Sequence, residues 1–261
     1  MNFRRKNKLS ILEVNQLKKI YSTRFGGNQV EALTDVNFSV EEGEYIAIMG
    51  ESGSGKTTLL NILAALDKPT SGNVILDGKN ISKIGESKMT DFRRSNIGFV
   101  FQDFNLLDTF TLEDNIFLPL VLSGKKYKYM KDKLNPIAKE LRIEEILKKY
   151  PYEVSGGQKQ RAAIARAIIT DPKLVFADEP TGALDSKSAD ELLRLFAKVN
   201  RLGQTILMVT HSVKSASFAD RVLFIRDGKI FHQIYKGNDA DLKFYEKISN
   251  TITLLASGGE S

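Results

Sequence analysis

The chain has 261 residues, 42% hydrophobic and 27% charged, which is typical of a globular protein and excludes a disordered or fibrous chain. No apolar run approaches the roughly 18 residues that span a bilayer, and the absence of cysteine excludes disulfides and cysteine-bound metal clusters. The net charge of +6 is concentrated in residues 1–10 and 125–149, two basic stretches that would face nucleic acid, an acidic membrane surface or simply solvent.

Short apolar runs alternate with longer helical patterns along most of the chain. This alternation predicts an α/β fold with a largely parallel sheet. The core strands are too apolar to have a solvent-exposed face, so we expect helices on both sides of the sheet. These strands are Tyr45–Met49, Ile97–Phe101, Leu174–Ala177, Ile206–Val209 and Val222–Ile225.

The N-terminal part alternates more regularly between apolar and polar residues. Such alternation, with glycine-containing turns, is typical of antiparallel sheets, and we therefore expect an antiparallel flank beside the parallel core. Its predicted strands are Ile11–Leu17, Glu31–Val40 and Asn73–Leu76, linked by turns at Gly26-Gly27, Glu42-Gly43 and Asp77-Gly78.

The stretch from Leu112 to Tyr150 is charged and helical in pattern, without a convincing strand. We interpret it as part of a helical subdomain, about residues 103–170, inserted into the core. Proline breaks the hydrogen-bond ladder of a helix, so we expect interruptions at Pro119, Pro136 and Pro151. After the core we expect an edge strand at Lys229–Tyr235 and an amphipathic helix at Leu242–Leu255 with a loose tail.

The strand predicted at Tyr45–Met49 leads directly into GESGSGKT, residues 50–57, which a helical pattern follows. This order of strand, loop and helix is the setting of a phosphate-binding loop, in which glycines let backbone N–H groups point at an anion. Lys56 would reach the outer phosphates and the Thr57 hydroxyl would bind Mg²⁺. We expect nucleotide contacts from Gly50, Glu51, Ser52, Gly53, Ser54, Gly55, Lys56, Thr57 and Thr58.

An acidic pair follows another apolar strand, in KLVFADEP, residues 173–180. Ligands of parallel sheets bind at the carboxyl ends of the strands. There Asp178 would hold Mg²⁺, through water, and Glu179 would orient and polarise an attacking water. The alternative is that both residues only cap the next helix.

A second element suited to phosphate is VSGGQKQR, residues 154–161, before a nearly all-apolar helix. Ser155 would cap the helix, and Gly156 and Gly157 would expose backbone donors at its start. Here the sequence resembles the ATPases of ABC transporters, and SGGQ resembles their signature motif. The resemblance extends from Ile11 to about Tyr235, with the motifs in the family's order.

The resemblance implies a fold and a division of the chain. The fold is a P-loop NTPase (RecA-like) core with a parallel sheet, an antiparallel β flank and an inserted α-helical subdomain. Residues 1–10 would form a basic N-terminal arm, residues 11–236 the ATPase domain, and residues 237–261 a C-terminal helix and flexible tail.

The resemblance also implies a head-to-tail homodimer that closes two ATP molecules between its subunits. The phosphate-binding loop of one copy would face the SGGQ of the other, so that Ser155, Gly156, Gly157 and Gln158 contact the γ-phosphate. Asp185 of GALD, residues 182–185, matches the acidic residue of the D-loop at the dimer seam.

Three more residues take roles from the resemblance. Gln102 matches the Q-loop, which touches Mg²⁺ or water and communicates with the membrane partner. His211 matches the switch histidine, which binds the γ-phosphate and supports Glu179. Tyr21 stands where the family has an aromatic ring that stacks on adenine, although it could also be an ordinary strand aromatic. The segment that follows Tyr21 lengthens the first hairpin relative to the family.

Two segments, EPTGALDSKS and FVFQDFNLLDTFTLEDNI, resemble the branch of macrolide-efflux and lipoprotein-releasing ATPases, and within it the bacitracin-type peptide-antibiotic resistance transporters. This implies an ABC permease as a separate chain, a sensor histidine kinase reached through it, and a location on the cytoplasmic face of the membrane.

Other classes of ATPase share part of this pattern. ATPases of DNA repair and chromosome organisation share the chemistry but carry long coiled coils or zinc-bearing insertions, whereas residues 103–154 contain no cysteine and no sustained heptads. Translation-associated relatives carry two cassettes in one chain. A regulatory module that binds ATP without hydrolysing it would not need Glu179 and His211. Because the insertions of the DNA-associated ATPases are missing, nucleic acid is not the expected partner.

Overall fold

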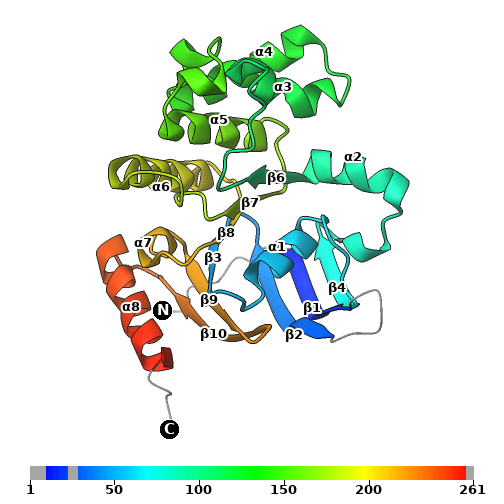
Figure 1. Cartoon of the computed structure of the whole chain (residues 1–261), viewed down its shortest axis with the longest axis vertical. Helices are drawn as coiled ribbons and strands as arrows, with labels where there is room; N and C mark the ends of the chain where they lie inside the picture. Colours follow the sequence, from blue (N-terminus) through cyan, green and yellow to red (C-terminus); the bar gives the residue numbers. More distant parts are fainter. Residues whose placement is uncertain (1–9, 23–28, 257–261) are drawn as a thin grey trace, which may run out of the picture.

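The computed structural model describes residues 10–22 and 29–256. The Gly26-Gly27 turn, most of the N-terminal basic arm and the C-terminal tail lie outside the described residues. Figure 1 shows a body built on two sheets, with a group of helices, α3, α4 and α5, at one end and the C-terminal helix α8 at the other.

The main sheet has six strands in the order β10-β9-β3-β8-β7-β6. All its neighbours pair in parallel except β9 and β10. β10 is the edge strand expected, and it runs antiparallel to β9. The predictions of the core strands are confirmed to within one residue at either end. The strands are β3 (Tyr45–Met49), β6 (Ile97–Val100), β7 (Leu174–Asp178), β8 (Ile206–Val209), β9 (Arg221–Arg226) and β10 (Lys229–Tyr235).

The second sheet is the antiparallel flank, in the order β2-β1-β4-β5. Its strands are β1 (Ser10–Tyr21), β2 (Val30–Glu41), β4 (Ser71–Leu76) and the short β5 (Lys79–Asn80). The predicted turn at Asp77-Gly78 is confirmed, and it leads from β4 into β5, a strand that was not predicted. Glu42-Gly43 does not link two flank strands, because it leads from β2 into β3 of the main sheet.

Helix α1 (Lys56–Leu63) packs between the two sheets. It buries Leu59, Leu60, Ile62 and Leu63, which belong to a core cluster shared with residues of both sheets. Helix α2 (Glu86–Asn96) follows the flank and leads directly into β6. The phosphate-binding loop is therefore held between β3 and a helix whose apolar side is buried on both sheets.

The helical group consists of α3 (Leu112–Val121), α4 (Tyr127–Leu141) and α5 (Gly156–Ile168). The expectation that Pro119 and Pro136 interrupt the helices is wrong, since each lies inside one. In α4 the reason is burial: Met130, Leu134, Ala138 and Leu141 form one buried stripe that continues past Pro136, and this packing outweighs the lost hydrogen bond.

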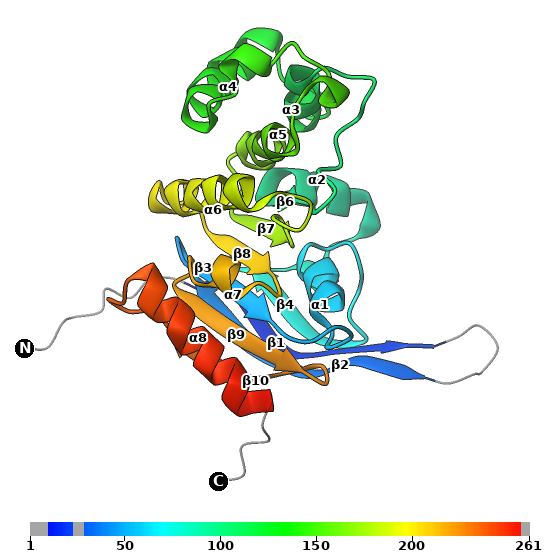
Figure 2. The ribbon, with the colours of Figure 1, turned by 60° about the vertical axis from the view of Figure 1, so that its left-hand side comes forward.

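The remaining helices are α6 (Ser186–Arg201), α7 (Val213–Ala216) and α8 (Asp241–Ala256). The predicted C-terminal helix is confirmed, and it packs into the main core through Phe244 and Ile248, which are fully buried. Figure 2 shows α8 lying along the side of the sheet, far from α3 and α4. None of the helices in the described part of the chain is long and apolar enough to cross a membrane.

Candidate functional site

The loop between β3 and α1 has glycine where the backbone is left-handed or where other backbone approaches closely. Gly53 and Gly55 have φ angles of 81° and 101°, in the region that glycine adopts without strain. A Cβ at Gly55 would lie 2.5 Å from the carbonyl oxygen of Ala32, and one at Gly50 would lie 2.3 Å from that of Ile225. The predicted glycines therefore allow the loop to press against both sheets.

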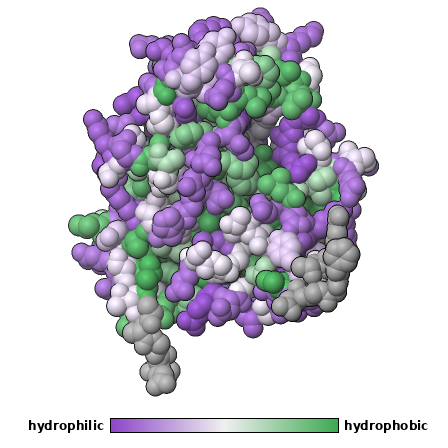
Figure 3. All heavy atoms as spheres, viewed as in Figure 1, coloured by the Kyte–Doolittle hydropathy of each residue, from purple (hydrophilic) through white to green (hydrophobic). Residues whose placement is uncertain are grey.

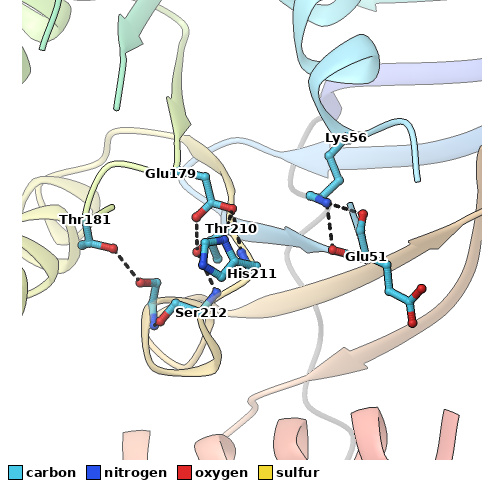
Figure 4. Close-up of polar contacts among 9 residues, drawn as sticks. Glu51, Lys56, Glu179, Thr181, Thr210, His211 and Ser212 are labelled. Atoms are coloured by element: carbon cyan, nitrogen blue, oxygen red, sulfur yellow. Dashed lines mark hydrogen bonds and ion pairs between the residues drawn. The ribbon is translucent and has the colours of Figure 1, made fainter. Parts of the chain in front are cut away.

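Lys56 folds back over this loop. Its Nζ donates to the carbonyl oxygens of Gly50, at 2.8 Å, and Glu51, at 2.6 Å. Burial lowers the pKa of Lys56, whereas the charges of Glu179 and Asp178 raise it. Figure 4 shows the ammonium group above the loop, opposite Glu179. Lys56, predicted to reach phosphate, is thus a partly buried cation, and among the described residues its hydrogen bonds go only to carbonyl groups of its own loop.

Two hydroxyl groups of the loop are available to a ligand in the described structure. The hydroxyl of Ser54 is buried without a hydrogen bond, and Thr57, on the first turn of α1, is exposed. The first N–H groups of a helix have no partner within it and carry its positive dipole end. Because buried polar groups are normally paired, this donor set fits an anion such as a phosphate chain.

Glu179 occupies a left-handed position, φ 43°, immediately after β7. This sharp turn aims its carboxylate at the end of β8. Oε2 accepts from the Thr210 hydroxyl at 3.0 Å, and Oε1 accepts from the backbone N–H of His211 at 2.8 Å and lies 2.7 Å from Nδ1 of His211. Figure 4 shows this cluster. The structure therefore brings together two residues, Glu179 and His211, that the sequence separates widely.

Asp178 is the last residue of β7, half-buried beside Glu179. Burial and the neighbouring charge of Glu179 raise the pKa of its carboxyl group, and the charge of Lys56 opposes them. Within residues 10–22 and 29–256, no three His, Asp or Glu side chains converge to hold a metal by themselves. A single carboxylate and a hydroxyl that complete their coordination with phosphate oxygens and water fit Mg²⁺, which is commonly bound in this way.

The SGGQ element forms a separate group. Ser155 is the N-cap of α5: its hydroxyl accepts from the N–H of Gln158, and the Gln158 Oε1 accepts from the N–H of Ser155. The added Cβ of Gly156 would lie 3.2 Å from Leu184, so this helix end packs on the GALD segment. Asp185 caps α6, and hydrogen bonds from Ser188 lower the pKa of Asp185. Figures 1 and 2 place α5 in the helical group, away from α1.

Gln102 lies beside the GALD segment. It is exposed just after β6, and its side-chain amide lies against Gly182, whose added Cβ would be 3.0 Å from Nε2. Sequence reasoning missed a second glutamine here. Gln160 is fully buried on α5 and donates through Nε2 to the carbonyl oxygens of Phe101 and Pro180, so it ties the ends of β6 and β7 to the SGGQ helix. The only signal of this role in the sequence was the position of Gln160, a polar residue just before the apolar run of that helix.

Tyr21 lies at the end of β1, 42% exposed. Its hydroxyl donates to Asp67 at 2.9 Å, and the Lys19 ammonium lies 4.7 Å from the ring centre. Burial raises the pKa of Tyr21, and a hydrogen bond with the Thr58 hydroxyl partly offsets this rise. The ring is therefore near the start of α1, and its stacking on adenine stays a prediction.

A family comparison decides what this arrangement belongs to. The model of the ABC transporter family matches residues 33–182, which is more than half of the chain. The chain belongs to the ABC transporter family. It is an ATP-binding cassette, and thus an ATPase, and the predicted resemblance and fold class are confirmed.

Individual relatives extend this match over nearly the whole chain. ABC transporter ATP-binding protein YxdL from Bacillus subtilis is 49% identical over 94% of this chain and 95% of that protein. Bacitracin export ATP-binding protein BceA from Halalkalibacterium halodurans is 46% identical over 95% of this chain and 97% of that protein. Macrolide export ATP-binding/permease protein MacB from Chlorobaculum tepidum is 42% identical over 84% of this chain but only 33% of its own length.

The solved structures agree with this assignment. The dimeric post-hydrolysis state of the ATP-binding cassette MJ0796, bound to ADP and Pi, has a TM-score of 0.77 and 37% sequence identity, and the match covers 86% of this chain and 98% of that one. ATP-binding cassettes of this family form dimers and work with membrane permeases.

Proposed function

We propose that this chain is the ATP-hydrolysing subunit of a transporter for resistance to, or export of, bacitracin-like antimicrobial peptides. The 46% identity to the bacitracin export protein extends over nearly the full length of both chains, which supports this substrate class. The arrangement that carries the catalytic part is the carboxylate of Glu179, held by Thr210 and His211, opposite Lys56.

The chemistry follows from this arrangement. Lys56 and the loop N–H groups would hold the β- and γ-phosphates of ATP, while Tyr21 would stack on adenine. Glu179 would accept the proton of the attacking water, and the contact of His211 with Oε1 would orient that carboxylate. Mg²⁺, when bound, would neutralise phosphate charge, and Thr57, Asp178 and Gln102 would hold it.

A second copy would complete the site. The backbone donors at Gly156 and Gly157 start a helix and lie apart from α1 within one chain. In a head-to-tail dimer, Ser155 to Gln158 of one copy would meet the γ-phosphate held by the other, with Asp185 at the seam. ATP closes such a dimer because its charge binds both sets of donors, and hydrolysis weakens the closure.

The partner that moves the peptide would be a separate permease on the membrane, with this chain on its cytoplasmic face and a sensor histidine kinase reached through the permease. A groove of about 430 Å³ separates the sheet from the helical group and offers a docking place. Apolar and basic side chains near the Gln102 loop line it: Leu66, Arg93, Arg94, Leu118, Leu122 and Arg166. Of these, Leu66 and Leu122 are exposed and the others are half-buried. Its position beside Phe101 would couple docking to the ATP site.

This proposal is tested by isolating the Glu179→Gln protein with its partners. We expect affinity purification from membranes with Mg²⁺ and ATP to recover a permease with the cassette. Cells that carry only the variant should become sensitive to bacitracin or a related peptide. Unchanged resistance to every peptide tested, or recovery of nucleic acid in place of a permease, would refute it.

A further inference from the structure

The turn between α3 and α4 has an unusual surface. Nine consecutive residues, 121–129, are exposed, and we name them the α3–α4 tip. Four of the nine are large apolar or aromatic residues with exposed fractions between 43% and 66%: Val121, Leu122, Tyr127 and Tyr129. Three others are lysines, Lys125, Lys126 and Lys128.

The tip has no negative charge nearby in sequence. Asp114 and Asp132 are the nearest acidic residues on either side, and none lies between them. The lysines also stand at the wrong end of α4 for helix stability, because the positive dipole end repels them. Lys126 is the N-cap without a side-chain hydrogen bond, and the first turn contains no acidic residue. These lysines therefore do not serve the helix itself.

The tip nevertheless makes several contacts of its own. The N–H of Gly124 donates to Val121 and that of Lys125 to Leu120. The ammonium of Lys125 lies 5.4 Å from the ring centre of Tyr129, and the ring of Tyr127 packs edge-on against buried Phe117. The apolar and charged side chains are thus presented together on a fixed turn. Figure 3 shows green apolar atoms beside purple hydrophilic ones over this end of the molecule.

We propose that the α3–α4 tip binds the surface of an anionic membrane, with Val121, Leu122 and the tyrosines in the headgroup region and the lysines on lipid phosphates. Tyrosine and aliphatic side chains with flanking lysines suit this boundary, because lysine stems reach along apolar surface while the ammonium stays in the polar layer. Anionic lipid attracts each nearby lysine.

A membrane fits this surface better than nucleic acid does. Nucleic acid would neutralise the lysines, but it offers no apolar phase to Val121 and Leu122. The tip also adjoins the groove proposed for the permease, since Leu118 and Leu122 line that groove. That the tip faces the membrane when the permease is docked rests on the proposed function. The inference adds to that function a direct contact between the cassette and lipid.

The first test is flotation of the purified full chain with vesicles, without any permease. We expect binding to vesicles of phosphatidylcholine with phosphatidylglycerol, and little to phosphatidylcholine alone. Lys125→Glu/Lys128→Glu should lower partitioning about tenfold or more. Glutamate near the start of α4 suits the helix dipole, so this loss would not come from melting of the helix. ATP binding of each variant reports its fold.

The matched control is Lys79→Glu/Lys83→Glu, which changes the net charge equally on two exposed lysines of the flank. It should change partitioning by less than about twofold. Equal losses in both variants would show a general charge effect and overturn the proposal. A loss seen only when Arg4, Arg5, Lys6 and Lys8 are neutralised would also overturn it.

A second measurement locates the contact. Because the chain contains no cysteine, Ser123→Cys and Ser82→Cys each accept one environment-sensitive fluorophore. We expect a blue shift on addition of anionic vesicles at position 123 and none at position 82. Val121→Ser/Tyr129→Ser should weaken the binding that remains at high salt. No shift at position 123, or wild-type binding by the serine variant, would overturn the proposal.

The permease contact is measured separately. If Lys125→Glu/Lys128→Glu lost the permease while it kept full vesicle binding, the tip would be a protein contact and the lipid inference would fail alone. If no permease were recovered with wild-type protein while vesicle binding followed the tip, the proposed function would fail alone.

Discussion

The two elements proposed to bind phosphate differ in how many of their own polar groups they pair through hydrogen bonds. The loop at residues 50–57 leaves the Ser54 hydroxyl buried and unpaired and needs left-handed glycines. The SGGQ element is an ordinary capped helix start in which Ser155 and Gln158 bond each other. The loop therefore leaves a buried polar group free for a ligand, whereas the SGGQ element already pairs its own capping groups. Its contact with a second copy remains part of the proposal.

The largest expected effect concerns the loop side. Glu179→Gln should lower ATP turnover about 100- to 1000-fold, because an amide cannot accept the proton of the attacking water. ATP binding should remain, since the loop and Lys56 are unchanged. Turnover and nucleotide binding measured on the same preparation test this. Turnover close to wild type would contradict the role of Glu179.

The next effect tests the geometry of the loop. Gly55→Ala should lower the free energy of unfolding by about 2–3 kcal/mol, because its left-handed backbone combines with a Cβ 2.5 Å from the Ala32 oxygen. Gly53→Ala is the matched control: its φ is also positive, but nothing lies within 4 Å of its Cβ, so about 1 kcal/mol is expected. Chemical denaturation measures both, and equal effects would count against a tight fit at Gly55.

A smaller effect is expected on the SGGQ side. Ser155→Ala removes the cap and should lower the free energy of unfolding by about 1 kcal/mol. Ser155→Asp keeps a good N-cap, yet its charge would repel a γ-phosphate. Thermal stability should therefore separate the two variants, whereas turnover should fall in both. If Ser155→Asp hydrolysed ATP normally, SGGQ would not contact phosphate.

The smallest effect concerns pH. Because the pKa of Asp178 is raised above its ordinary value of 3.8 in the folded protein, the free energy of unfolding should fall as pH rises from that value to the raised pKa. Above this range Asp178→Asn should stabilise the nucleotide-free protein, by less than about 1 kcal/mol because solvent screens a half-exposed group. Denaturation curves between pH 3 and 8 test this; destabilisation near neutral pH would contradict it.

The sequence predicted those parts of the fold whose signals are local. Buried strands appear as short apolar runs, and the glycines of the loop stand within eight consecutive residues. The prediction from the prolines was wrong because it considered only the local sequence. Helix α4 continues past Pro136 since its buried stripe from Met130 to Leu141 packs into the core. The role of Gln160 could not be predicted for a similar reason, because the two carbonyl groups that it binds lie on segments distant in sequence.

By itself, the sequence determined which residues are chemically equipped to bind and hydrolyse a nucleotide, since a phosphate-binding loop and an acidic pair are recognisable from order and residue type. Only the tertiary structure decided that Lys56, Glu179 and His211 lie around one place, because β3, β8 and β7 are neighbours in one parallel sheet and end at the same edge. It also decided that Ser155 lies elsewhere, where helix packing and not chain order places it.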